Sequence, residues 1–131
     1  MGERKEPLIL LVDDDNLVAD VLSCWLTAAG LKPVVASSGR EAIDKFRLMA
    51  FTAVVLDVDL GPAPDGFGVL EDIRRENLDI PVIMISGTAN VDVGKNAIQR
   101  GACAFLAKPF DPESLLRLIT ASTGGAQSGS K

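Results

Sequence analysis

The 131-residue chain has no histidine, only two cysteines and no excess of positive charge. Without histidine and without a C-x-x-C pair, the sequence offers no ligand set for a zinc site. Cys24 and Cys103 lie far apart in apolar segments, so the pattern does not indicate the disulfide framework of a small secreted domain. We expect both cysteines to be buried as small hydrophobic side chains.

Basic charge and long hydrophobic runs are both scarce. The formal net charge is −5, so the sequence lacks the basic footprint of direct nucleic-acid binding and favours cations or basic protein surfaces as partners. The apolar run at residues 8–12 is far shorter than a membrane-spanning helix, and the start of the chain lacks the apolar core of a signal peptide. We therefore predict a cytoplasmic protein with one core and no membrane contact.

Short apolar runs alternate along the chain with segments of helical periodicity. The runs are uninterrupted and rich in valine and isoleucine, as is typical of strands covered on both faces of a parallel sheet. Strands and helices that alternate through right-handed crossovers favour a doubly wound, flavodoxin-like α/β fold, with a five-stranded parallel sheet in the order 2-1-3-4-5 and helices on both faces. The predicted strands are residues 8–12, 32–36, 53–56, 81–85 and 102–107.

Local signals mark three of the helix starts. Asp15 is a candidate cap for the first helix, and Ser38 with Glu41 three residues later has the capping-box pattern. Asp111 followed by Pro112 opens the last helix.

Composition also divides the chain into three parts. We predict an N-terminal extension at residues 1–6, a folded domain at residues 7–122, and a flexible Gly/Ser-rich tail or linker at residues 123–131. A stand-alone protein and a domain taken from a longer chain both remain open.

Polar residues follow every predicted strand, but those after the second strand, Ser37 and Ser38, are uncharged and lie at the edge of the predicted sheet. Asp13 to Asp15 follow the first strand, Asp57 the third, Ser86 the fourth and Lys108 the fifth. In this fold, ligands bind beyond the carboxyl ends of the strands, and these four strands are neighbours in the predicted order. We expect the acids, the hydroxyl and the ammonium to converge on one edge of the sheet.

Three carboxylates cannot share such a cleft without compensation. Two of them about 4 Å apart repel by about 4 kcal/mol at an effective dielectric near 20. Protons or a cation must therefore intervene, and Lys108 balances only one charge. We predict Mg²⁺, a hard ion that takes several oxygen ligands, bound by Asp13 and Asp14 rather than both acids serving as helix caps.

Four fragments together resemble the receiver domain of two-component response regulators, of the chemotaxis-regulator type. The resemblance covers about residues 7–122, and it is specific because each fragment stands at a predicted strand end in the family's order. The fragments are LVDDD at 11–15, VVLDVDL at 54–60 with Asp65-Gly66 beyond, MISG at 84–87 and FLAKPF at 105–110.

The resemblance implies a phosphoprotein that accepts its phosphoryl group on Asp57. The donor would be a phosphohistidine on a sensor histidine kinase or phosphotransfer protein. Asp14 and Asp57 would hold Mg²⁺ through their side chains, Asp13 mainly through water, and Asp59 through its backbone carbonyl. Lys108 would pair first with the acceptor carboxylate and then with phosphoryl oxygen.

The resemblance also implies a switch. Ser86 would donate its hydroxyl to the phosphoryl group, Phe105 would turn inward, and the Lys108–Pro109 bond would be cis. The surface of the fourth helix, fifth strand and fifth helix would then shift, and a downstream protein partner or output domain would detect the shift. Such a chain promotes its own phosphorylation and is not an enzyme with a separate turnover substrate.

The chain departs from the family pattern in the loop after Asp57. Gly61 stands where the family has a proline, and Pro62 and Asp65 come one position late, which places contact with the kinase and access of water in question. Asp59 is an acid beside the acceptor and could change metal affinity or phosphate lifetime in either direction.

Two other functions are compatible with parts of the sequence. A haloacid-dehalogenase-like Mg²⁺-dependent phosphatase also ends a strand on Asp-x-Asp, as in Asp57 and Asp59. In that family, however, an acidic pair comes after the lysine, whereas here the pair precedes Lys108. A receiver-like module that binds protein without phosphorylation would lack a site residue, and here each position is filled.

Overall fold

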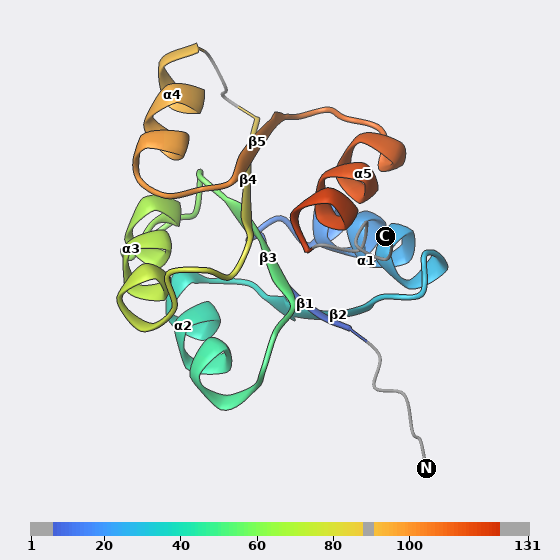
Figure 1. Ribbon diagram of the computed structural model, residues 1–131, viewed down its shortest axis with the longest axis horizontal. Coiled ribbons are helices and arrows are strands. Elements are labelled where there is room, and N and C mark those ends of the chain that lie inside the picture. Colours follow the sequence, from blue (N-terminus) through green and yellow to red (C-terminus); the bar gives the residue numbers. More distant parts are fainter. Residues whose placement is uncertain (1–6, 88–90, 124–131) are drawn as a thin grey trace.

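The computed structural model describes residues 7–87 and 91–123, which form a three-layer α/β sandwich (Figure 1). The sheet has five parallel strands in the order β2-β1-β3-β4-β5, as predicted. The strands are β1 (Leu8–Val12), β2 (Lys32–Ala36), β3 (Ala53–Asp57), β4 (Val82–Ser86) and β5 (Ala104–Ala107). The helices are α1 (Asn16–Ala28), α2 (Gly39–Leu48), α3 (Gly66–Glu76), α4 (Val91–Gln99) and α5 (Pro112–Ser122).

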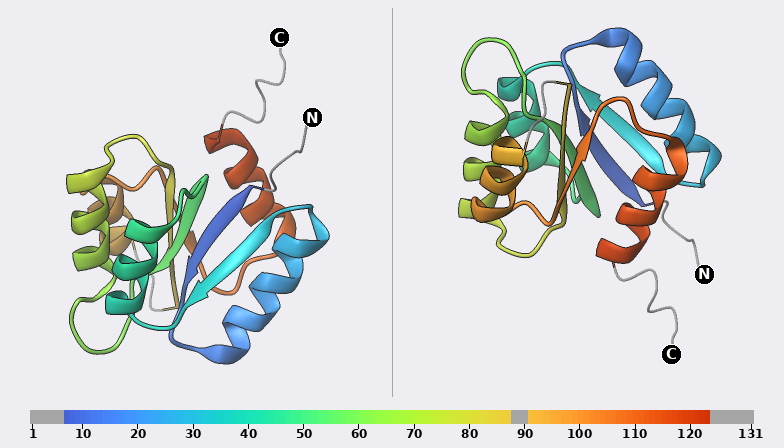
Figure 2. Two further views of the ribbon diagram at one scale, coloured as in Figure 1. Left: turned by 90° about the horizontal axis from the view of Figure 1, so that it is seen from below. Right: turned by 90° about the horizontal axis from the view of Figure 1, so that it is seen from above.

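The helices cover both faces of the sheet, as Figure 2 shows: α1 and α5 lie on one face, and α2, α3 and α4 on the other. Successive side chains of a strand point to opposite faces. On β1, Ile9 and Leu11 therefore pack against α1 and α5, whereas Leu10 and Val12 pack on the side of α2 and α3. The uninterrupted apolar runs are thus explained by two separate cores, one on each face of the sheet, and not by the one core that we predicted.

Burial follows position in the sheet. Every residue of β3 and β4 is buried, because these strands have neighbours on both sides and helices on both faces. The edge strands β2 and β5 are mostly half-buried. β4 begins at Val82, one residue later than predicted, and ends at Ser86, while the Pro81 carbonyl still accepts from Val54 N–H at 2.9 Å.

The predicted helix caps are confirmed, one of them with a different partner. Asp15 accepts hydrogen bonds from backbone N–H groups in the first turn of α1, and Asp111 does the same for α5. Ser38 accepts from the N–H of Glu41 at 3.1 Å. The Glu41 carboxylate accepts from the N–H of Ser37 at 2.9 Å, one residue before the position expected in a capping box.

The expectation that both cysteines are buried is wrong. Cys24 and Cys103 are exposed. Cys24 lies on the face of α1 opposite Leu22 and Leu26, the residues that enter the core. Cys103 precedes the edge strand β5, beyond which no further strand covers the sheet.

The predicted extension at residues 1–6 and residues 124–131 of the predicted tail lie outside the described residues. The domain boundaries at 7 and 122 therefore stay predictions. Within the described ranges, no helix has the length and apolar character needed to cross a membrane.

Candidate functional site

The strand order brings four sequence-distant side chains to one edge of the sheet. Asp13 follows β1, Asp57 ends β3, Ser86 ends β4 and Lys108 follows β5. Register keeps these ends level, since Val12 pairs with Leu56, Asp57 with Ile85 and Ser86 with Ala107. The convergence predicted from the strand ends is confirmed.

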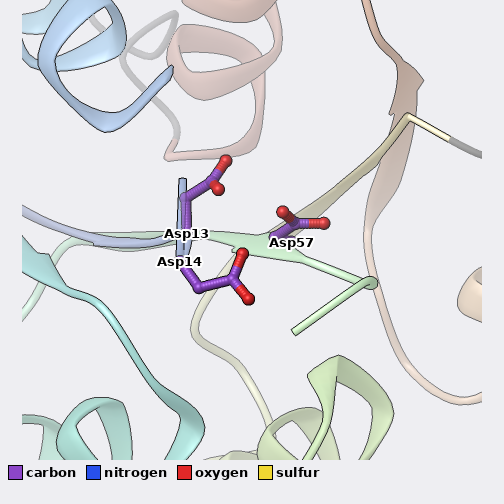
Figure 3. A group of neighbouring side chains, drawn as sticks. All are labelled: Asp13, Asp14 and Asp57. Atoms are coloured by element: carbon purple, nitrogen blue, oxygen red, sulfur yellow. The ribbon is translucent and has the colours of Figure 1, made fainter. Parts of the chain in front are cut away.

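Three carboxylates meet at this edge (Figure 3). Asp13, Asp14 and Asp57 each offer one oxygen, and these oxygens lie within 4.8 Å of one another. Asp13 and Asp57 are 0% and 2% exposed, whereas Asp14 is exposed. The group therefore has a buried floor and an open side through which an ion could enter.

Lys108 lies across the two buried carboxylates. Its Nζ is 3.1 Å from Asp13 Oδ2 and 3.1 Å from Asp57 Oδ2. Burial acts to lower the pKa of Lys108, but its hydrogen bonds to Asp13 and Asp57 outweigh burial, and the pKa is raised. Lys108 is thus an ammonium at neutral pH, and one positive charge faces two buried acids.

Asp57, the acid at the end of β3, is affected by this excess of negative charge. Burial first, and then the charge of Asp13, raise the pKa of Asp57 to about 6 against the opposing effects of the Asp59 N–H and of Lys108. The ionised form of Asp57 is therefore destabilised in the folded protein. A divalent cation would remove that penalty, so the donor set suits a hard metal ion such as Mg²⁺.

Backbone N–H groups fix the orientation of all three acids. Asp15 N–H donates to Asp13 Oδ1 at 2.9 Å, and Asp59 N–H donates to Asp57 Oδ1 at 2.8 Å. The third donor is Gly61 N–H, 3.1 Å from Asp14 Oδ2. Gly61 lies in the loop after β3, for which the sequence predicts one residue more than the family pattern, and this loop contacts the acidic group directly.

Asp59 and Ser86 make a contact that the sequence did not predict. Ser86 is fully buried, and its Oγ donates to Asp59 Oδ2 at 2.7 Å. Gly87 N–H donates to the same oxygen at 3.3 Å. The Asp59 side chain is thus directed to the end of β4 and is not part of the group formed by the other three acids. The predicted metal contact of its backbone carbonyl stays a prediction.

The remaining predicted residues lie on β5 and just after it. Phe105 is half-buried and packs on the core beneath α3 and α4. Its ring lies so close to Gly94 of α4 that a Cβ there would be 3.2 Å away. The Lys108–Pro109 peptide bond is cis, as predicted. The switching role of Phe105 stays a prediction.

Fold, acidic group and bridging lysine together define a signalling receiver of the two-component type. The family model for the response regulator receiver domain matches residues 9–120. The chain therefore belongs to this family.

Individual relatives agree with this assignment. A putative NtrX-like response regulator of Rickettsia conorii is 35% identical over 113 residues, which cover 86% of this chain and 24% of the relative. This chain thus spans about a quarter of that relative's length. The receiver domain of NtrX from Brucella abortus is 31% identical, with a TM-score of 0.85 over 90% of this chain and 99% of that one.

A third relative bears on the metal. The receiver domain of a sensor histidine kinase from Pseudomonas aeruginosa is 26% identical, with a TM-score of 0.83 over 92% of this chain and 99% of that one. Its structure has a magnesium ion coordinated in the active site cleft.

Proposed function

We propose that this receiver takes a phosphoryl group from a phosphohistidine onto Asp57 in a Mg²⁺-dependent reaction. The observation that carries the proposal is the buried carboxylate of Asp57, which lies 3.1 Å from the Lys108 ammonium and within 4.8 Å of two further acids. A nucleophilic oxygen, a fixed cation and a set of hard ligands are the parts that phosphoryl transfer needs.

Asp14 and Asp57 would hold Mg²⁺ through carboxylate oxygens, and Asp13 through water. The bound ion would neutralise negative charge on the acceptor and on the transferring group. The acids fit this role because one of them, Asp14, is exposed and the other two are buried beside a single ammonium. The magnesium ion in the Pseudomonas aeruginosa relative supports the choice of metal.

In the transfer, a carboxylate oxygen of Asp57 forms a bond to phosphorus while the bond from phosphorus to the histidine nitrogen breaks. The electron pair leaves with the imidazole. The Lys108 ammonium, held by Asp13 as well as by Asp57, stays in place to bind phosphoryl oxygen as charge develops on it. Because the backbone N–H of Asp59 fixes the acceptor, little reorganisation is needed.

Two surfaces suit the proposed protein partners. A groove of about 270 Å³ runs between α1 and the segment after β5, lined by apolar side chains and by Lys108, so a kinase or phosphotransfer protein could dock beside the acceptor. On the other side of the site, a hollow lined by Phe105 and by α4 residues such as Lys95 and Ile98 would present the switched state to a downstream partner. We propose no separate turnover substrate.

Acetyl phosphate, a small phosphodonor, tests the proposed function by intact-mass measurement. With Mg²⁺ present, the wild-type protein should gain one phosphoryl group, and it should gain none in EDTA. Asp57→Asn should gain none under either condition, because an amide oxygen is not a comparable nucleophile. Asp44→Asn, an exposed acid on α2, is the matched control and should behave as wild type.

Three results would contradict this proposal. Equal phosphorylation of Asp57→Asn and wild type would remove Asp57 from its role. Steady release of phosphate from varied organic monoesters, measured with the same preparations, would favour the phosphatase instead, and the absence of any modification would favour a binding module.

The metal site gives a separate prediction for Asp14. Asp14→Asn should weaken Mg²⁺ binding by about tenfold or more, because it removes one charged ligand from the acidic group. The fold should be little affected, since Asp14 is exposed and its backbone-facing oxygen survives in asparagine. Titration with Mg²⁺, followed by the fluorescence of Trp25 in the groove beside Lys108, measures the change. Unchanged affinity would exclude Asp14 as a ligand.

A further inference from the structure

We propose that Asp59 is a positioning residue that holds the switch hydroxyl before phosphorylation. Its carboxylate binds Ser86 Oγ and Gly87 N–H, and the arrival of a phosphoryl group on Asp57 transfers the Ser86 hydroxyl from Asp59 to a phosphoryl oxygen. This inference rests on the proposed function and concerns how the same site is regulated.

The geometry of the two side chains carries the argument. Ser86 Oγ is 2.7 Å from Asp59 Oδ2, a length typical of a hydroxyl that donates to a charged carboxylate. The same oxygen also accepts from Gly87 N–H. Among the described residues, Asp59 therefore binds at least these two donors at the end of β4, the strand that pairs with β3 next to the acceptor.

The backbone of Asp59 ties this contact to the acceptor. Its N–H donates to Asp57 Oδ1 at 2.8 Å, while its carboxylate reaches across to Ser86. Lys108 contacts Asp57 and Asp13, so the ammonium and the Ser86 hydroxyl are held by different acids. A phosphoryl group would use both the Lys108 ammonium and the Ser86 hydroxyl as donors. Before the reaction these two donors are divided, because Asp57 holds the ammonium and Asp59 holds the hydroxyl.

Two consequences follow from this division. The Asp59 carboxylate competes with a phosphoryl oxygen for Ser86, and it adds a negative charge close to an anionic group. Binding of an anion at Asp57 therefore includes the loss of one charge-assisted hydrogen bond, the strong class of such bonds. Asp59 lowers the affinity of the site for the phosphoryl group, and its removal releases Ser86 in advance.

Beryllofluoride, a tetrahedral anion that adds to a carboxylate as a phosphoryl group would, is the probe. Its affinity is measured in the presence of Mg²⁺ for the wild type, Asp59→Ala, Ser86→Ala and the double variant. Asp59→Ala should bind beryllofluoride about tenfold more tightly when Ser86 is present, and at most about threefold more tightly when Ser86 is alanine. Asp59→Asn, which keeps an acceptor but not the charge, should lie between wild type and Asp59→Ala.

The control measurements separate the proposal from effects on metal or fold. Mg²⁺ affinity without fluoride is determined for every variant, and urea unfolding shows whether each one is folded. Asp44→Ala on α2 removes one negative charge from an exposed position and should leave beryllofluoride affinity unchanged.

Two outcomes would overturn the proposed transfer of the Ser86 hydroxyl from Asp59 to a phosphoryl oxygen. Equal tightening by Asp59→Ala in both backgrounds would show that charge alone is responsible. Weaker or unchanged binding in Asp59→Ala would show that Asp59 does not compete for the hydroxyl. If the wild type binds no beryllofluoride, or if Asp57→Asn binds it equally well, the proposed function itself fails, which is a result distinct from the other two.

Discussion

Replacing Lys108 with methionine will lower the free energy of unfolding of the metal-free protein by about 3 kcal/mol and will slow phosphoryl transfer at least about a hundredfold. The side chain is only 20% exposed and bridges Asp13 and Asp57, which are 0% and 3% exposed at their side chains. Methionine fills a similar volume, so the change removes the charge and leaves most of the packing. Two carboxylates would then face each other without a cation.

The two effects have different physical origins and are measured separately. Urea unfolding in EDTA gives the loss of stability, and the rate of mass gain from acetyl phosphate with Mg²⁺ gives the loss of transfer. Mg²⁺ should stabilise Lys108→Met more than it stabilises the wild type, because the ion replaces the positive charge that Lys108 supplies to this acid pair in the wild type.

The exposed Lys32 on β2 provides the matched control, and Lys32→Met should resemble wild type in both measurements. If Lys108→Met were as stable as wild type in EDTA, the acids would be compensated by something other than the ammonium, and the electrostatic account of the site would be wrong.

Replacing Asp57 with asparagine should have the opposite effect on the metal-free protein and stabilise it by about 2 kcal/mol near pH 8. Burial and the charge of Asp13 raise the pKa of Asp57 to about 6. Ionisation of this group is therefore less favourable in the folded than in the unfolded chain. Asparagine carries no charge to bury, and its oxygen can still accept from the Asp59 N–H, which wild-type Asp57 binds at 2.8 Å.

The pH dependence gives this prediction its sign. Because the pKa of Asp57 is higher in the folded state, protonation stabilises the wild type as the pH falls through about 6 towards the unfolded value of 3.8. The advantage of Asp57→Asn should thus be largest above pH 6 and should shrink towards about pH 4.5. Urea unfolding across this range, in EDTA, measures the difference in stability between the two proteins.

Saturating Mg²⁺ should reduce or reverse the difference, since the wild type has the stronger ligand set. A destabilised Asp57→Asn at high pH in EDTA, or an advantage that grows as the pH falls, would show that the buried acid does not oppose folding.

Sequence patterns were sufficient to place the strands and the acidic edge. The apolar runs predict β1 and β2 at the observed residues, because runs of this kind are buried on both faces and end where polar residues begin. Parallel strands align their carboxyl ends, so Asp13, Asp57, Ser86 and Lys108 could be brought together without coordinates.

Side-chain direction was harder to predict. Cys24 is in an apolar segment, yet the helical repeat turns it to solvent, and apolar composition alone does not give that angle. The contact of Asp59 with Ser86 depends on which way one side chain turns at the end of β3. The Asp-x-Asp spacing showed that an extra acid is present there but not whether it turns to the metal site or to β4.

The contact between Gly61 and Asp14 could not be predicted for a related reason. It joins residues that are far apart in sequence through a backbone N–H of the loop after β3. Every residue except proline has a backbone N–H group, so the type of residue does not show where this donor points. Its direction follows from the path of the loop.

The position of the phosphoryl group in the phosphorylated protein decides whether Asp57 is the acceptor. After treatment with acetyl phosphate and Mg²⁺, borohydride reduction converts an aspartyl phosphate to homoserine, and tandem mass spectrometry of the peptide that spans residues 53–66 distinguishes Asp57 from Asp59 and Asp65. We expect homoserine at position 57, formed with Mg²⁺ and absent in EDTA. Homoserine at Asp59 or Asp65 with Asp57 intact, or an equal yield in EDTA, would contradict this expectation.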